Sequence, residues 1–290
     1  MSLIENSLER LRRAAGGTKT AATGAVREPV TVLRDSTSPA EPRAVHRRTT
    51  IDLAGLRAQG YLPDAAQERR FADWCHRVKR PIIERALAEA GSDDARLIML
   101  TSALPGDGKT FITLSLALSM ARERDISVLL VDGDLPRAQI SRVLGIQHEP
   151  GLLNALRDEQ LDVESLIFDT EVPRLELLSA GSPPEGASEL VASLRMREIA
   201  ARLLSRSPQR LVLFDSPPLL VASEARALTS IPGQILLVAR AGCTPQRAVV
   251  DAVSQIDKKK LRGLVLNDAL VGSTHGYHDY DYASPVDSSR

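Results

Sequence analysis

Short apolar runs rich in Val, Ile and Leu alternate with helical patterns from Arg96 onward. The runs cover residues 97–100, 126–131, 175–178, 211–214, 235–238 and 261–266, and the helical patterns centre near Ser115, Met196, Ala225 and Val250. Continuous apolar runs of this length are typical of strands buried on both faces, and their alternation with helices is typical of βαβ units. The pattern predicts an α/β fold with a mostly parallel sheet flanked by helices.

The sequence before this core has a different pattern. Ile4, Leu8 and Leu11 recur at helical spacing behind a capping-box signature at Ser2 and Glu5, so a short amphipathic helix is predicted. Residues 16–48 lack periodicity and indicate a flexible, mildly basic linker. A second capped helix is predicted from about residue 64, with a kink or a break where it passes residue 81, a proline.

The strongest chemical signal follows the first predicted strand, where residues 103–110 read ALPGDGKT before a helical stretch. Gly106 and Gly108 let backbone N–H groups close around phosphate oxygens, Lys109 can reach the β- and γ-phosphates, and the Thr110 hydroxyl can bind Mg²⁺. Ala103 stands where the standard pattern begins with Gly. We interpret the segment as a phosphate loop in which Lys109 serves the phosphates and not the core; the alternative is an ordinary tight turn.

Two further predicted strands end in carboxylates. Asp132 and Asp134 follow the second strand, and Asp215 follows the run that ends at residue 214. Ligands of such sheets bind beyond the carboxyl ends of the strands, and phosphoryl transfer needs acidic groups to hold Mg²⁺ and to accept a proton. Each carboxylate alone could be a solvated loop residue, but beside a phosphate loop they predict a phosphoryl-transfer site.

Composition adds limits rather than chemistry. The 290 residues include 37 basic and 37 acidic side chains, so no chain-wide charge favours nucleic acid or an anionic membrane. Cys75 and Cys243 lie far apart without metal-ligand spacing, which favours a reduced cytosolic protein. No apolar stretch reaches the roughly 18 residues of a membrane span, so we expect neither a signal peptide nor a transmembrane anchor.

Three of the four tyrosines, Tyr277, Tyr280 and Tyr282, lie within the last fourteen residues. Apolar partners are missing around them, so they do not predict a core cluster. They are either modification sites or inert residues of a solvated tail.

Together, the loop at 103–110, VLLVDGDLPR at 128–137 and FDSPP at 214–218 resemble the Walker A, Walker A′ and Walker B motifs of the bacterial tyrosine kinases (BY-kinases) that accompany exopolysaccharide export. These kinases are a branch of the deviant Walker, partition-ATPase-like P-loop NTPase superfamily. The likeness covers residues 62–282 and is greatest to the tyrosine autokinases of exosortase-type loci. Leu104 stands where partition-type relatives carry a signature Lys, and the tyrosine tail resembles the cluster that a neighbouring subunit phosphorylates in this family.

The resemblance implies an ATP- and Mg²⁺-dependent protein tyrosine autokinase that regulates exopolysaccharide chain length and export and phosphorylates its tail in trans. The implied site residues are, as catalytic groups, Lys109, Asp132, Asp134 and Asp215; as nucleotide-binding residues, Pro105, Gly106, Asp107, Gly108, Lys109, Thr110, Phe111 and Asn267; as Mg²⁺ ligands, Thr110, Asp132 and Asp215; and as autophosphorylation sites, Tyr277, Tyr280 and Tyr282. Asp132 is implied as the acceptor of the tyrosyl proton.

The implied partners are the cytoplasmic segment of a membrane polysaccharide co-polymerase, further copies of the chain and a tyrosine phosphatase, with no nucleic acid. The implied location is cytoplasmic, at the inner membrane through the partner. Trp74 stands where the family's oligomerisation motif has Glu, although Arg77 and Arg80 of that motif are kept. Two alternatives stay open: a partition- or carrier-type ATPase, and a non-catalytic, nucleotide-dependent scaffold of the export complex.

We therefore predict four parts of the chain. These are a short helix with a flexible linker (1–48), a helical arm (49–95), the P-loop kinase domain (96–267) and a flexible tail that contains the tyrosines (268–290).

Overall fold

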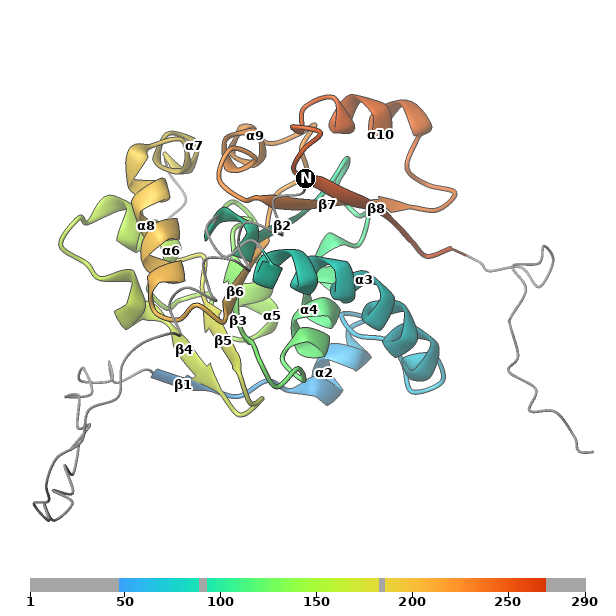
Figure 1. Cartoon of the computed structure of the whole chain (residues 1–290), viewed down its shortest axis with the longest axis horizontal. Coiled ribbons are helices and arrows are strands. Elements are labelled where there is room, and N and C mark those ends of the chain that lie inside the picture. Colours follow the sequence, from blue (N-terminus) through green and yellow to red (C-terminus); the bar gives the residue numbers. More distant parts are fainter. Residues whose placement is uncertain (1–46, 89–92, 183–185, 270–290) are drawn as a thin grey trace, which may run out of the picture. The chain divides into compact units, whose positions relative to one another are not determined.

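The computed structural model describes residues 47–88, 93–182 and 186–269 (Figure 1). All of them belong to the unit that begins at Ala44. The predicted amino-terminal helix and the tail with Tyr277, Tyr280 and Tyr282 lie outside the described residues. No described helix combines the length and the apolar character that crossing a membrane requires.

A single sheet runs through the described unit, with the strand order β1-β4-β5-β3-β6-β2-β7-β8. Every neighbouring pair is parallel except β4 with β5, so the predicted mostly parallel α/β sheet is confirmed. The strands are β1 (Arg47–Thr49), β2 (Leu97–Ser102), β3 (Ser127–Asp132), β4 (Phe168–Thr170), β5 (Leu175–Leu178), β6 (Arg210–Asp215), β7 (Gln234–Arg240) and β8 (Leu261–Asn267). All six predicted runs are strands, whereas β1 and β4 were not predicted.

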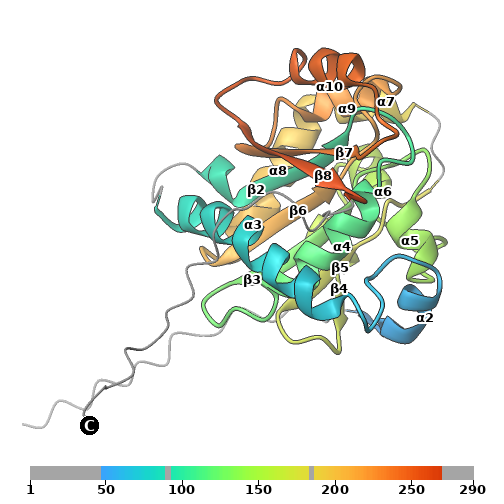
Figure 2. The ribbon, with the colours of Figure 1, turned by 90° about the vertical axis from the view of Figure 1, so that its right-hand side faces the viewer.

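Helices cover both faces of this sheet (Figures 1 and 2). They are α2 (Leu53–Ala58), α3 (Glu68–Ala88), α4 (Lys109–Met120), α5 (Gln139–Val143), α6 (Leu152–Arg157), α7 (Ala187–Val191), α8 (Leu194–Ser205), α9 (Ser223–Leu228) and α10 (Gln246–Val253), with 3₁₀ turns at Asp93–Arg96 and Val163–Leu166.

The core has two layers because side chains alternate between the two faces of each strand. Leu97 and Met99 of β2 belong to one buried cluster, which packs against α6 to α10. Ile98 and Leu100 alternate with those residues along β2 and belong to the other buried cluster, which packs against α3 and α4. This arrangement explains why the central strands are apolar at successive positions.

The predicted capping contact before α3 is present, because the Asp64 carboxylate accepts the Gln67 N–H at 2.8 Å, but the helix itself begins at Glu68 and not near residue 64. The helix then continues through Pro81 to Ala88, so, of the kink or break predicted there, the break is wrong. A proline inside a helix removes one backbone hydrogen bond, but Cys75 and Ile82 on the inner face of α3 are buried against the core. Tertiary packing therefore outweighs the local preference.

Candidate active site

The phosphate loop connects β2 to α4 and depends on two glycines. Gly106 has a φ of 86° and Gly108 a φ of 89°, a left-handed conformation that residues with a side chain rarely adopt. Helix α4 begins at Lys109, directly behind the loop, so its amino-terminal N–H groups face the same place. The loop therefore has the backbone geometry that sequence analysis assigns to phosphate binding.

Asp107 braces this loop instead of extending into solvent. One carboxylate oxygen accepts the Leu104 N–H at 3.0 Å, and the other accepts the Thr244 hydroxyl at 2.6 Å. Its carbonyl accepts the Asn267 amide at 3.0 Å. A Cβ on Gly108 would come within 2.0 Å of that same amide nitrogen, so a side chain there would displace the Asn267 amide from Asp107. Thr244, which follows β7, was not found from the sequence.

The three predicted carboxylates come together at the ends of β3 and β6. Asp132 and Asp215 are direct partners in the register of these neighbouring strands, and both are 0% exposed; Asp134 is 1% exposed. The Thr110 hydroxyl donates to Asp215 at 2.7 Å, and the Thr113 hydroxyl donates to its other oxygen at 3.0 Å. Thr113 was not predicted, although it lies one helical turn after Lys109.

Lys109 closes onto these acids. Its Nζ atom lies 2.7 Å from Asp134 Oδ2 and 3.6 Å from Asp215 Oδ2, and its side chain is 11% exposed. Burial of the ammonium lowers its pKa, but Asp215 and Asp134 outweigh this effect and hold the pKa above its usual value. The expectation that Lys109 makes no contact in the core is wrong.

Asp132 is held on one side only. Its Oδ2 atom accepts both the backbone N–H and the hydroxyl of Ser141, each at 2.7 Å, whereas the buried Oδ1 atom has no hydrogen-bond partner. Burial raises the pKa of Asp132 to about 7, against the two hydrogen bonds from Ser141, which lower it. Burial also raises the pKa of Asp215, although Lys109 and Thr110 oppose the shift. Ser141 was not found from the sequence.

These residues fit Mg²⁺ only together with a nucleotide. No group of three or more acidic, His or Cys side chains in the described ranges is arranged as a metal site by itself. Mg²⁺ commonly binds through one or two carboxylates, several waters and substrate phosphates. The Thr110 hydroxyl, Asp215 and the unpartnered oxygen of Asp132 are oxygen donors of the required kind.

The remaining predicted residues lie at the rim. Pro105 is exposed, and Phe111 is partly buried on α4, where its ring packs edge-on against Phe71 of α3 at 5.1 Å between centroids. The ring of Trp74 packs against the same Phe71, at 5.0 Å between centroids. Phe71 therefore links Trp74, which stands at the Glu position of the family motif, to Phe111 next to the phosphate loop. Arg77 of that motif is exposed.

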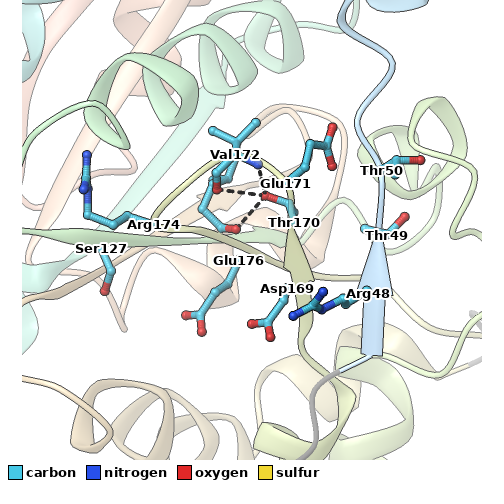
Figure 3. Close-up of a pocket in the computed structure, with 11 residues that line it drawn as sticks. Arg48, Thr49, Thr50, Ser127, Asp169, Thr170, Glu171, Val172, Arg174 and Glu176 are labelled. Carbon is cyan, nitrogen blue, oxygen red and sulfur yellow. Dashed lines mark hydrogen bonds between the residues drawn. The ribbon is translucent and has the colours of Figure 1, made fainter.

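A hollow of about 750 Å³ lies elsewhere, between β1 and the turn from β4 to β5 (Figure 3). Its side chains are largely engaged: Glu171 accepts the Ile51 N–H at 2.7 Å, and Glu176 pairs with Arg210 at 2.8 Å. Because Ser127, the first residue of β3, lines it, the hollow lies at the opposite ends of the parallel strands from the phosphate loop. Its lining includes neither the phosphate loop nor Asp132, Asp134 and Asp215.

A glycine-rich loop at the end of one parallel strand, facing carboxylates from two neighbouring strand ends, defines a P-loop nucleotide-binding protein. No protein-family model matches the chain. The chain is 30% identical over 203 residues to the tyrosine-protein kinase Ptk of Acinetobacter johnsonii. This alignment covers 69% of the present chain and 27% of Ptk. The chain is 31% identical over 196 residues to the tyrosine-protein kinase Wzc of Salmonella typhimurium, covering 65% and 26%.

Solved structures agree with the sequence relatives. The tyrosine kinase domain of BceF superimposes with a TM-score of 0.60 and 27% identity, over 78% of this chain and 92% of that domain. The chain is therefore similar to bacterial tyrosine kinases, over 69% of its length in the case of Ptk and 78% in the case of the BceF kinase domain. It spans less than a third of the length of Ptk or Wzc, and the match to those relatives is confined to that share.

Proposed function

We propose that the chain is an ATP- and Mg²⁺-dependent protein tyrosine kinase that phosphorylates Tyr277, Tyr280 and Tyr282 in the tail of another copy. The observation that carries this proposal is the convergence of Lys109, Thr110 and the buried carboxylates of β3 and β6 on one phosphate loop. The kinase relatives support the same reaction class.

In this proposal, the N–H groups of the loop and the Lys109 ammonium bind the phosphates. Lys109 then turns from Asp134, its partner in the nucleotide-free chain, to the phosphates. Bound Mg²⁺ would neutralise charge on the phosphates. Thr110 and Asp215 would be its protein ligands, and Asp132 would be a further ligand, either directly or through a water molecule. The tyrosyl oxygen attacks the γ-phosphorus, the bond to the bridging oxygen breaks, and ADP leaves with those electrons. The unpartnered Oδ1 atom of Asp132 accepts the tyrosyl proton.

The wider setting follows the family resemblance. We propose that the kinase acts in the cytoplasm, at the inner membrane, where the cytoplasmic segment of a polysaccharide co-polymerase activates it and a tyrosine phosphatase resets it. Self-association brings tail and site together, and the cycle regulates the length and export of an exopolysaccharide. Nucleic acid has no part in it.

The test is to incubate the purified chain with Mg·ATP and the co-polymerase segment and to probe for phosphotyrosine. We expect a signal that disappears when all three tail tyrosines are replaced by Phe. ATP hydrolysis without phosphotyrosine would favour a partition- or carrier-type ATPase instead. Nucleotide binding without either reaction would favour a scaffold.

A further inference from the structure

Ser141 lies at the junction of β3, β5 and α5, where it is 1% exposed. Its N–H and its hydroxyl both point to one oxygen of Asp132, each at 2.7 Å. Its hydroxyl oxygen accepts the backbone N–H of Ala180, which follows β5, at 3.0 Å. One side chain thus joins the carboxylate at the end of β3 to the backbone behind β5.

The direction of the Ser141 hydroxyl proton follows from these contacts. Because the Ala180 N–H can only donate, the serine oxygen must accept there, and its own proton is left for Asp132 Oδ2. Oδ2 then has two donors, and Oδ1 has none. A carboxylate fixed in this way cannot exchange its two oxygens without breaking both bonds.

The backbone that carries Ser141 is held in a strained shape. Ala138, at the start of α5, has a φ of 45°, which is uncommon for a residue with a side chain. Its N–H donates to the Asp134 carbonyl at 2.6 Å, so the turn from the carboxylates to α5 is short and closed. Strain of this kind persists where the surrounding contacts hold it, commonly at functional sites.

We propose that Ser141 is a positioning residue that fixes Asp132, so that Oδ2 is occupied and Oδ1 is presented to Mg²⁺, its water or the incoming tyrosyl group. The inference rests on the proposed kinase function, which supplies the reaction that Oδ1 serves. Partners that orient a ligating carboxylate commonly affect metal affinity or activity about 10- to 100-fold when removed.

Three substitutions separate this role from packing. Ser141→Thr keeps the hydroxyl. Ser141→Val has nearly the same shape as the Thr variant but lacks the hydroxyl, and Ser141→Ala removes the hydroxyl without adding volume. Ser115→Ala is the matched control, because Ser115 on α4 is also buried and its hydroxyl has no partner. Thermal unfolding of each variant shows which of them are folded.

We expect Ser141→Thr to keep kcat within about threefold of the wild type, and Ser141→Val and Ser141→Ala to lose about 10- to 100-fold in kcat. ATP affinity without Mg²⁺ should be unchanged, since Lys109 and the loop still bind the phosphates. Equal kcat for the Thr and Val variants would overturn the proposal. If neither folds, equal kcat for Ser141→Ala and Ser115→Ala would do so.

The kinase proposal can fail separately. If the wild type forms no phosphotyrosine with its partner segment, that function is wrong, and the gain in ATP affinity on adding Mg²⁺ becomes the measurement. A smaller gain for Ser141→Val than for Ser141→Thr would support the positioning role. An equal gain in both would refute it.

Discussion

Asp132→Asn should make the nucleotide-free protein more stable at neutral and alkaline pH, although it removes a residue of the proposed reaction. The carboxylate is 0% exposed and lies among other acids, so its ionised form is disfavoured in the folded chain. An Asn oxygen can still accept both hydrogen bonds from Ser141, and the amide never ionises. The substitution therefore removes a buried charge without removing its two hydrogen bonds.

The size of the effect follows from the pKa of Asp132, which burial raises from 3.8 to about 7. Below about pH 4 the carboxyl is protonated in both states and has no effect on the free energy of unfolding. Between pH 4 and 7 the unfolded chain ionises while the folded chain keeps the proton, so the wild type loses stability as pH rises. At about 1.4 kcal/mol per unit, roughly 4 kcal/mol is lost by pH 8.

Urea denaturation of both proteins at several pH values, in a chelator and without nucleotide, measures this difference. We expect the stability of Asp132→Asn to exceed that of the wild type by roughly 4 kcal/mol at pH 8 but by only about 1 kcal/mol at pH 4.5. Asp73→Asn changes an exposed carboxylate on α3 and is the control. The difference between its free energy of unfolding and that of the wild type should be the same at every pH tested. A variant that is less stable than the wild type at pH 8 would refute the reasoning.

Further substitutions test other contacts of the site. Lys109→Met should abolish phosphotyrosine formation. In urea denaturation at pH 8 it should also reduce the free energy of unfolding by about 3–5 kcal/mol, because it leaves buried carboxylates without their cation. An unchanged free energy of unfolding would contradict the Lys109–Asp134 ion pair. Ala138→Gly should add about 0.5–1 kcal/mol by relieving the left-handed backbone, and a loss in the same assay would argue against strain there. Gly108→Ala should weaken ATP binding about tenfold or more in calorimetry, because its φ of 89° and the nearby Asn267 amide oppose a side chain, and wild-type affinity would show that the loop yields.

The central sheet and the phosphate loop could be predicted because their signals are local. Buried parallel strands are apolar at successive positions, and once β3 and β6 are identified as neighbours, Asp132 and Asp215 must meet at one edge. Strands β1 and β4 have three residues each, with Arg47 and Arg48 in the first, so no apolar run marks them. Only pairing with the rest of the sheet makes them strands.

The contacts that complete the site were missed for a similar reason. Ser141 follows Asp132 by nine residues in a helix of five, and Thr244 reaches Asp107 across 137 positions of the sequence. Neither spacing belongs to a recurring motif, because the fold and not the local chain brings these atoms together. The contact of Lys109 with Asp134 was also missed, since a motif assigns Lys109 to the phosphates and says nothing of where it lies without them.

The charges of the site link stability to function. Asp132, Asp134 and Asp215 are buried together, and among the described residues one cation, Lys109, pairs with these acids, so three ionised carboxylates would exceed the positive charge beside them. A proton on Asp132 reduces the deficit, which agrees with its pKa near 7. Mg²⁺ would supply the missing charge, so its arrival with ATP should release that proton and ionise the carboxylate. Asp132 would then be able to accept a tyrosyl proton only after the metal and nucleotide are bound, which protects the site from acting as a base before its substrate is complete.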